Sequence, residues 1–186
     1  MARTPSVMIP LGFKAPAFEL LDVKTDQIIK SEDLFGIKGT LIMFICNHCP
    51  FVKHINEQIV QIANDYKNSG IKLIAISSND IINYPEDSPV EMKKIAIKEK
   101  FIFPYLFDET QIVAKSYDAV CTPDFFGYNN SLELQYRGRI RELDNLKPVR
   151  AGDSDLFIAM KQIAETTKGP ETQIPSVGCG IKWLNN

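Results

Sequence analysis

The chain has 186 residues, of which 45% are hydrophobic and 24% are charged, and this is enough to build one globular domain with a buried core. Its formal net charge is −2, with lysine and arginine scattered along it, so neither nucleic acid nor a membrane surface is an expected partner. The opening residues 1–16 contain prolines but no long apolar run, which excludes a secretory signal and a transmembrane helix there. We therefore expect a single domain over residues 1–186 in the cytoplasm.

The first half of the chain alternates between strand and helix patterns. Residues 18–34 are typical of a hairpin or an extended lead-in, and the unbroken apolar run 40–45 predicts a strand buried on both faces. Apolar side chains then recur every three or four residues over 52–66, which predicts an amphipathic helix with Gly70 as its C-terminal cap. Residues 71–77 predict a second buried strand.

The second half continues the alternation. Ser88 and the proline and glutamate that follow it predict the start of a helix that runs to about Lys100. The later predicted elements are a strand at 105–108, a short helix at 109–117, a hairpin at 124–138 that turns at Asn129–Asn130, and a helix at 153–170. This order predicts an α/β fold: a central mixed sheet flanked by helices, with an N-terminal extension and a C-terminal helix plus tail.

Two cysteines mark the point where the first buried strand gives way to a helix. Cys46 follows the strand, and Cys49 falls in the first turn of the helix. Unpaired N–H groups and the positive end of the helix dipole favour a thiolate there, and cysteine pKa values in such settings fall from about 8.5 to roughly 3.5–7.5. In a reducing compartment, such a pair is more often catalytic or metal-binding than structural.

The spacing of the two cysteines favours disulfide chemistry. Two intervening residues within one turn bring the sulfurs within bonding distance, so we expect Cys46 to attack a partner disulfide as a thiolate and Cys49 to resolve the mixed disulfide. Pro50 is tolerated because first-turn N–H groups lack intrahelical partners, and His48 can stabilise the Cys46 anion. The alternative is that both thiols only pack in the core, as buried cysteines often do.

With these motifs in view, the chain resembles thioredoxin-fold proteins of the redoxin group (AhpC/TSA and TlpA-like), in a subgroup marked by CNHCPFVKH. The similarity extends over nearly the whole chain and includes LGFKAPAFEL, FPYLFDETQIVAKSYDAVCTPDFF and GCGIKW. It implies a thioredoxin-like fold and a cis-proline at Pro123, which holds an extended backbone with which a substrate peptide can pair. It also implies that Asn47, Cys121 and Thr122 border the substrate.

The chain departs from thioredoxin itself at several positions. Ile45 stands in place of the tryptophan before the first cysteine, and Thr40 stands in place of a buried aspartate. The residues between the cysteines are Asn47 and His48, and a histidine before the second cysteine resembles the strongly oxidising periplasmic oxidant of bacteria. We therefore expect a reduction potential less negative than the roughly −270 mV of thioredoxin.

The two other cysteines leave alternatives open. Cys121 is either a small packed hydrophobe or a third active-site thiol. Cys179 is either structural or able to resolve a sulfenic acid formed at the active site. The polar loop 77–89 follows the carboxyl end of a strand, where α/β folds place their sites, and either shapes a substrate cleft or is only a surface loop.

Three functional hypotheses follow. The first is a thiol–disulfide oxidoreductase, which needs no resident cofactor, acts on protein or small-molecule disulfides, and is itself reduced by a thioredoxin or glutathione system. The second is a thiol peroxidase acting on peroxides, although the Pro-x-x-x-Thr/Ser-x-x-Cys pattern of peroxiredoxins fits neither Cys46 nor Cys49. The third is a copper(I)- or zinc-binding protein with ligands from Cys46, Cys49, Cys121 and His48.

Overall fold

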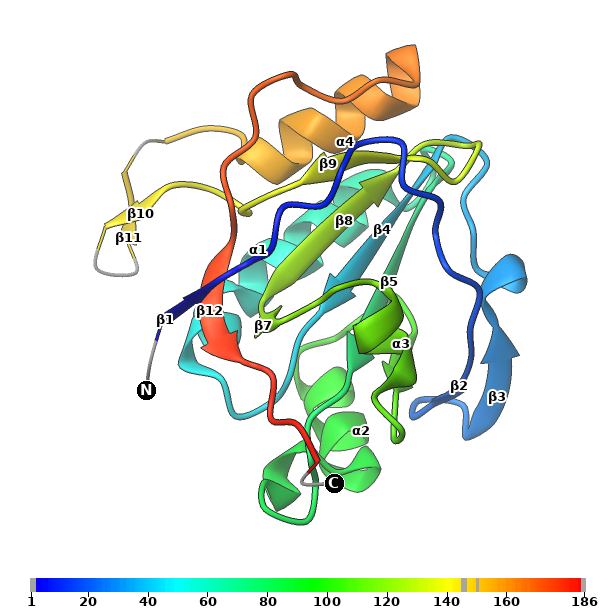
Figure 1. Ribbon diagram of the computed structural model, residues 1–186, viewed down its shortest axis with the longest axis vertical. Helices are drawn as coiled ribbons and strands as arrows, with labels where there is room; N and C mark the ends of the chain where they lie inside the picture. Colours follow the sequence, from blue (N-terminus) through cyan, green and yellow to red (C-terminus); the bar gives the residue numbers. More distant parts are fainter. Residues whose placement is uncertain (1–2, 145–146, 150, 185–186) are drawn as a thin grey trace.

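The protein is built around a seven-stranded mixed sheet in a computed structural model that describes residues 3–144, 147–149 and 151–184 (Figure 1). The strand order is β3-β2-β6-β5-β4-β8-β9, with β4, β5 and β6 parallel and the outer pairs antiparallel. In chain order, the strands are β2 Glu19–Asp22, β3 Gln27–Lys30, β4 Gly39–Phe44, β5 Ile71–Ser77, β6 Tyr105–Phe107, β8 Asp124–Tyr128 and β9 Leu134–Arg137.

Helices cover both faces of this sheet, as the alternation of side chains along β4 requires. Leu41 and Met43 belong to one buried cluster with residues of α1, α2 and α4, whereas Ile42 and Phe44 belong to a second cluster with residues of α3. The helices are α1 Pro50–Tyr66, α2 Pro89–Lys98, α3 Ile112–Ser116 and α4 Asp155–Thr166, and there are short 3-10 turns, η1 Ser31–Asp33 and η2 Pro85–Asp87. The predicted fold class is thus confirmed.

Most predicted elements are found close to their predicted bounds. β5 matches the predicted strand, and the hairpins β2–β3 and β8–β9 are both present. The cap prediction for Gly70 is wrong, because α1 ends at Tyr66 with Lys67 as its cap. Gly70 instead adopts a left-handed φ of +86° in the turn before β5.

A small second sheet joins the two ends of the chain and was not predicted. Its order is β1-β12-β7, with β1 Arg3–Pro5, β12 Val177–Gly180 and β7 Cys121–Thr122. The Thr122–Pro123 peptide bond that follows β7 is cis, as the family resemblance implied. A further two-stranded ribbon consists of β10 Leu143–Asp144 and β11 Lys147–Pro148.

Across the described residues, none of the helices combines the length and the apolar character needed to cross a bilayer. The expectation of one domain over residues 1–186 stays a prediction.

Candidate active site

The local backbone places both thiols of the CxxC motif at the N-terminus of α1. β4 ends at Phe44, and Cys46 lies in the short connection that follows. Cys49 is the N-cap residue of α1, with extended backbone angles (φ −65°, ψ 121°), and Pro50 takes the first helical position. Proline is favoured there because its missing N–H has no intrahelical partner and its fixed φ suits the helix.

Both thiols are enclosed by protein. The exposed fraction is 1% for Cys46 and 0% for Cys49. All four cysteines lie in the described part of the chain and are present as thiols. A bulky disulfide can therefore reach this pair only after a neighbouring segment moves.

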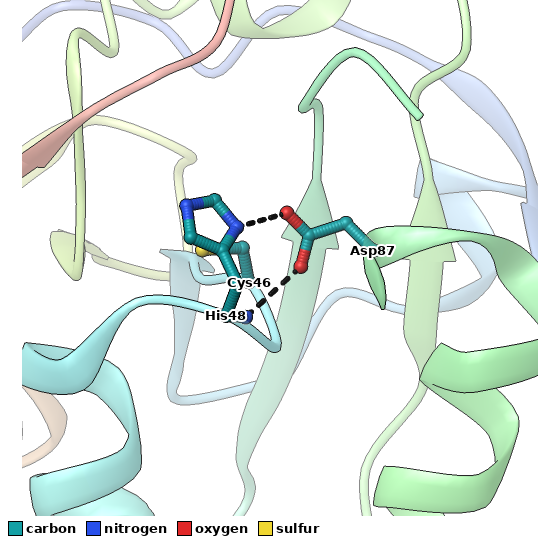
Figure 2. A group of neighbouring side chains, drawn as sticks. All are labelled: Cys46, His48 and Asp87. Atoms are coloured by element: carbon teal, nitrogen blue, oxygen red, sulfur yellow. Dashed lines mark hydrogen bonds and ion pairs between the residues drawn. The ribbon is translucent and has the colours of Figure 1, made fainter. Parts of the chain in front are cut away.

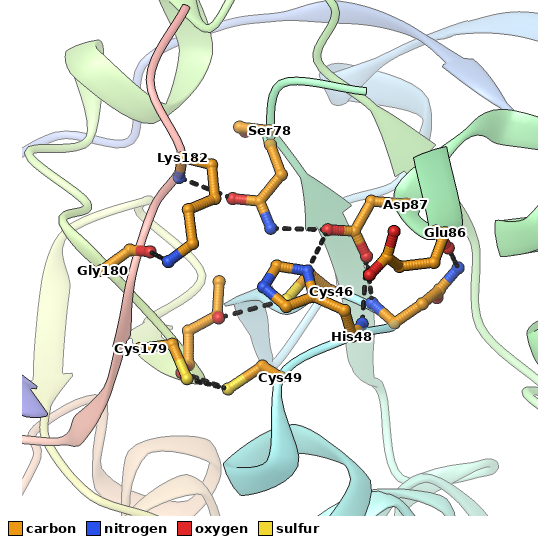
Figure 3. Close-up of polar contacts among 12 residues, drawn as sticks. Cys46, His48, Cys49, Ser78, Glu86, Asp87, Cys179, Gly180 and Lys182 are labelled. Atoms are coloured by element: carbon orange, nitrogen blue, oxygen red, sulfur yellow. Dashed lines mark hydrogen bonds and ion pairs between the residues drawn. The ribbon is translucent and has the colours of Figure 1, made fainter. Parts of the chain in front are cut away.

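Three thiols and one threonine form a connected cluster (Figure 3). The sulfur of Cys46 lies 3.3 Å from the hydroxyl oxygen of Thr122. The sulfur of Cys49 lies 3.2 Å from the carbonyl oxygen of Thr122 and 2.9 Å from the sulfur of Cys179. Cys46 and Cys49 thus both contact Thr122, and Cys49 also contacts Cys179.

The pKa values of the two thiols in the CxxC motif are shifted in opposite directions. Its hydrogen bond with Cys46, helped by Cys179 and the backbone N–H of Val52, outweighs burial and lowers the pKa of Cys49 to about 5. The same bond, together with burial and the Asp87 carboxylate, raises the pKa of Cys46 well above its ordinary value. Cys49 is therefore the more acidic thiol of the two, and attack by an anionic Cys46 stays a prediction.

A buried carboxylate on the neighbouring loop holds the CxxC motif in place. Asp87, in η2, accepts hydrogen bonds from the backbone N–H groups of Asn47 and His48 at 2.7 and 3.1 Å. Its other oxygen lies 2.5 Å from Nδ1 of His48 (Figure 2). The same oxygen accepts a hydrogen bond from Nδ2 of Asn79 at 2.8 Å. Burial acts to raise the pKa of Asp87, but the bonds from His48, Asn79 and Asn47 keep it below its ordinary value.

These contacts fix the imidazole of His48 beside Cys46. The ring stacks on Tyr84 with 5.1 Å between centroids, and Asp87 holds Nδ1. The other nitrogen, Nε2, is buried and has no hydrogen-bond partner among the described residues. A carboxylate that fixes one ring nitrogen leaves the other available for proton transfer, which is the geometry of a positioned acid–base group.

The predicted metal ligands are only partly assembled. Within the described ranges, the group that brings three candidate donors together is Cys46, His48 and Asp87, with donor atoms within 4.8 Å of one another. Cys49 and Cys121 do not belong to it. One thiol in such a group is a poor match to a thiolate-rich copper(I) site, since soft metals select sulfur ligands.

Asn47, Thr122 and Cys121 have different surroundings. Asn47 donates its amide to the Glu86 carbonyl oxygen at 2.8 Å and accepts from the Tyr105 hydroxyl at 3.1 Å, so it ties the motif to the 85–87 turn. Thr122 faces Cys46. Cys121 is buried, with its sulfur 3.8 Å from the Pro123 carbonyl oxygen, and burial raises the pKa of this thiol. Their roles toward substrate, and that of Pro123, stay predictions.

The sequence did not indicate that Asp87 contributes to the site, and it did not place Cys179 there. The position of loop 77–89 after β5 pointed to a site, but nothing in the sequence singled out Asp87 within it. Cys179 was identified as a candidate without a location, because β12 has no strand pattern. Thr40, in place of the buried aspartate of thioredoxin, accepts a hydrogen bond from the Gly36 N–H at 3.0 Å.

Comparisons with known proteins agree with the fold. The model of the AhpC/TSA family matches residues 11–143. A crystal structure of an uncharacterised conserved protein from Geobacillus kaustophilus is 45% identical with a TM-score of 0.95, and the match covers 100% of this chain and 98% of that one. A hypothetical protein from Sinorhizobium meliloti is 35% identical with a TM-score of 0.91, covering 98% and 100%.

A more distant match identifies the fold alone. The thioredoxin domain of a thiol-disulfide oxidoreductase from Bacteroides vulgatus is 18% identical with a TM-score of 0.59, and the match covers 70% of this chain and 89% of that chain. Among curated proteins, none matches.

Proposed function

The chain belongs to the AhpC/TSA family and has a thioredoxin-like fold, and we propose that it is a thiol–disulfide oxidoreductase. The family and the fold support an oxidoreductase activity. The observation that carries this proposal is that the sulfurs of Cys46 and Cys49, at the N-terminus of α1, lie 3.3 and 3.2 Å from the hydroxyl and carbonyl oxygens of Thr122. Two thiols held in contact, one of them with a pKa of about 5, are suited to alternate between a dithiol and a disulfide.

In the first step, Cys46 attacks a substrate disulfide. Cys49 is enclosed by Cys46, Cys179 and the Thr122 carbonyl oxygen, whereas Cys46 borders His48 and the Thr122 hydroxyl. The Cys46 proton passes to the Cys49 thiolate or to His48. The resulting Cys46 thiolate bonds to one substrate sulfur, and the other substrate sulfur leaves as a thiolate.

In the second step, Cys49 resolves the mixed disulfide. It gives its proton to the departing thiolate and attacks the Cys46 sulfur, which releases the second substrate thiolate. The products are a Cys46–Cys49 disulfide, one substrate thiol and one substrate thiolate that takes its proton from water, so the substrate has gained the two electrons that the protein lost.

Reduction of insulin disulfides by the full chain, with dithiothreitol as the electron source, tests the proposal. The wild type should accelerate insulin precipitation over dithiothreitol alone, and Cys46→Ser and Cys49→Ser should each abolish the acceleration. Cys121→Ser is the matched control, because it removes an equally buried thiol that is not hydrogen-bonded to the pair. Full activity in Cys46→Ser would refute the assigned role.

A thiol peroxidase is the second candidate. It is favoured by the near-complete burial of Cys46, since a small peroxide needs less space than a disulfide-bonded peptide. The hydroxyl of Thr122, 3.3 Å from the Cys46 sulfur, could donate to a peroxide oxygen there. Stopped-flow mixing with hydrogen peroxide distinguishes the two candidates, because only a peroxidase forms a sulfenic acid at Cys46 within seconds.

The cellular setting is part of the proposal. We place the protein in the cytoplasm, with disulfides as substrates, a thioredoxin or glutathione system as its reductant, and no nucleic-acid or membrane partner. We expect a reduction potential less negative than the roughly −270 mV of thioredoxin. Equilibration with a glutathione buffer, followed by thiol trapping, measures this potential, and a value at or below that of thioredoxin would refute the expectation.

A further inference from the structure

The C-terminal strand occupies the edge of the Thr122–Pro123 segment, where the family resemblance places a substrate peptide. β12 pairs antiparallel with β7, so that Cys179 lies opposite Thr122 and Gly180 lies opposite Cys121. The Ser176 hydroxyl donates to the Pro123 carbonyl oxygen at 2.7 Å, and the backbone N–H of Ile181 donates to the Val120 carbonyl oxygen at 2.9 Å. This chain therefore carries its own extended segment in that place.

The segment is also tied to the loop that holds the histidine. The backbone N–H of Lys182 donates to Oδ1 of Asn79 at 2.8 Å, and Nδ2 of the same Asn79 donates to Asp87. The Lys182 ammonium lies 5.6 Å from the centroid of the Tyr84 ring, which in turn stacks on His48. The C-terminal segment thus runs along the dithiol from Thr122 to the Asp87 turn.

This arrangement presents one further thiol to the pair. The sulfur of Cys179 lies 2.9 Å from that of Cys49, and the exposed fraction of Cys179 is 1%. Cys179 thus lies where the resemblance places a substrate peptide, and its sulfur contacts a cysteine of the redox pair. This is the position that a substrate cysteine would occupy. The second strand neighbour, β1, pairs with β12 on its outer edge and holds it there.

We propose that Cys179 is a third redox-active thiol, which accepts the Cys49 sulfur from the Cys46–Cys49 disulfide and leaves Cys46 as a thiol. The proposal rests on the proposed function, because that function supplies the first disulfide. It assigns the C-terminal strand the role of a built-in substrate, in addition to its structural pairing with β7.

The step is an internal exchange that needs no added oxidant or reductant. The Cys179 thiolate attacks the Cys49 sulfur, the Cys49–Cys179 bond forms, and the Cys46–Cys49 bond breaks with Cys46 as the leaving thiolate. The proton lost by Cys179 ends on Cys46, so the number of protons and electrons in the protein is unchanged.

The pKa of Cys179 depends on whether Cys46 and Cys49 are a dithiol or a disulfide. In the dithiol form, burial, the hydrogen bond with Cys49 and the charge of Cys49 raise the pKa of Cys179 to about 12, while Lys182 opposes them. A Cys46–Cys49 disulfide removes the Cys49 charge and so removes two of these causes. The third thiol then becomes more acidic at the stage at which it has to attack.

Peptide mapping of the oxidised full chain tests the proposal. The wild type is incubated with oxidised glutathione, quenched with acid, alkylated and digested with trypsin. Cleavage after lysine and arginine leaves Cys46 and Cys49 together in peptide 39–53, Cys121 in peptide 116–137 and Cys179 in peptide 169–182. The expected product is peptide 39–53 cross-linked to peptide 169–182, with the alkyl group on Cys46.

Other products would overturn the proposal. They are peptide 39–53 with an internal disulfide and an alkylated Cys179, a cross-link through Cys46 instead of Cys49, or three alkylated thiols. Cys46→Ser gives a second reading, since oxidised glutathione should join Cys49 to Cys179 directly in that variant.

The outcomes also separate this inference from the proposed function. A protein that reduces insulin and forms only the Cys46–Cys49 disulfide would refute the role of Cys179 and leave the oxidoreductase proposal standing. A protein in which neither disulfide forms and insulin is not reduced would refute both.

Discussion

Gly178 packs so closely against Thr122 that a methyl group at residue 178 would overlap the carbonyl carbon and oxygen of Thr122. Gly180, two residues further along the same strand, has more room: a Cβ atom there would lie 3.3 Å from the Thr4 hydroxyl oxygen and 3.9 Å from the Val120 carbonyl oxygen. The close approach of β12 to Thr122 therefore requires a glycine at residue 178 but not at residue 180.

Gly178→Ala should lift β12 from β7 and expose the dithiol. We expect severalfold faster alkylation of Cys46 by iodoacetamide than in the wild type, because the strand that encloses the thiols can no longer pair with Thr122. Quantifying adducts in peptide 39–53 over time measures this rate. Gly180→Ala should alkylate at the wild-type rate, and equal rates in all three proteins would show that β12 does not cover the site.

Asp87→Asn should change the acidity of Cys46. The carboxylate contributes to the raised pKa of Cys46, so its removal should lower that pKa, which the pH dependence of Cys46 alkylation reports. Insulin reduction should fall roughly 10²-fold at the same time, because the asparagine no longer holds His48 in a proton-transferring tautomer.

The matched control for Asp87→Asn is Asp80→Asn, which changes a carboxylate of the same loop that is bonded to Ile82 and Asn83. Asp80→Asn should leave the pH dependence of Cys46 alkylation and the rate of insulin reduction at their wild-type values. An unchanged alkylation profile in Asp87→Asn would show that the carboxylate does not act on Cys46.

The low pKa of Cys49 should make the reduced protein more stable as the pH rises. An unfolded cysteine has a pKa of about 8.5, whereas the pKa of Cys49 in the folded protein is about 5, so the folded state binds fewer protons between these values. Its contribution to the free energy of unfolding is complete above the unfolded pKa and is lost as the pH falls through the folded pKa.

Urea unfolding of the reduced protein at pH 5 and pH 8 measures this contribution. The gain between these two pH values should be larger in the wild type than in Cys49→Ser, which lacks the titrating thiol. The same gain in both proteins would contradict a thiolate at residue 49.

Arg137→Met should destabilise the fold by about 3–5 kcal/mol, because it leaves a buried carboxylate without its partner. Arg137 and Asp124 are both fully buried and form an ion pair, and the guanidinium also lies 3.7 Å from the centroid of the Phe126 ring. Burial already raises the pKa of Asp124 to about 6, and loss of Arg137 should raise it further. The folded carboxyl then holds its proton more tightly, so the destabilisation should grow as the pH rises from 5 to 8.

Arg139→Met is the control for this measurement. Its ion pair with Asp155 is partly exposed, so the cost should be about 0–1 kcal/mol. Chemical denaturation of both variants makes the comparison, and similar losses would contradict the special role of the buried pair.

The sequence predicted the central architecture because local patterns reflect the physics of those elements. The apolar run of β4 follows from its burial on both faces, and the three- and four-residue spacing along α1 follows from burial on one face. The start of α2 follows from the preference of proline for the first helical position, since Ser88 is the N-cap residue but its side chain makes no capping hydrogen bond. The resemblance to the redoxin group supplied the cis bond before Pro123, which no local pattern specifies.

The missing parts depend on contacts between distant segments. β12 spans four residues with two glycines, and it is a strand only because β7 and β1 lie on either side of it. Asp87 acts on the CxxC motif from a 3-10 turn 38 residues beyond Cys49, and sequence spacing does not encode such a contact. The helix N-terminus alone did not predict the raised pKa of Cys46, which depends on the neighbouring Cys49, on burial and on Asp87.

Intact-mass analysis of Cys49→Ser after incubation with oxidised glutathione tests whether Cys46 is the thiol that attacks a disulfide, since this variant can attack a disulfide but cannot resolve the product. We expect one glutathione per chain, attached to Cys46 and absent from the double variant Cys46→Ser/Cys49→Ser. A chain that stays unmodified, or that carries the glutathione on Cys121 or Cys179 with Cys46 still a thiol, would contradict it.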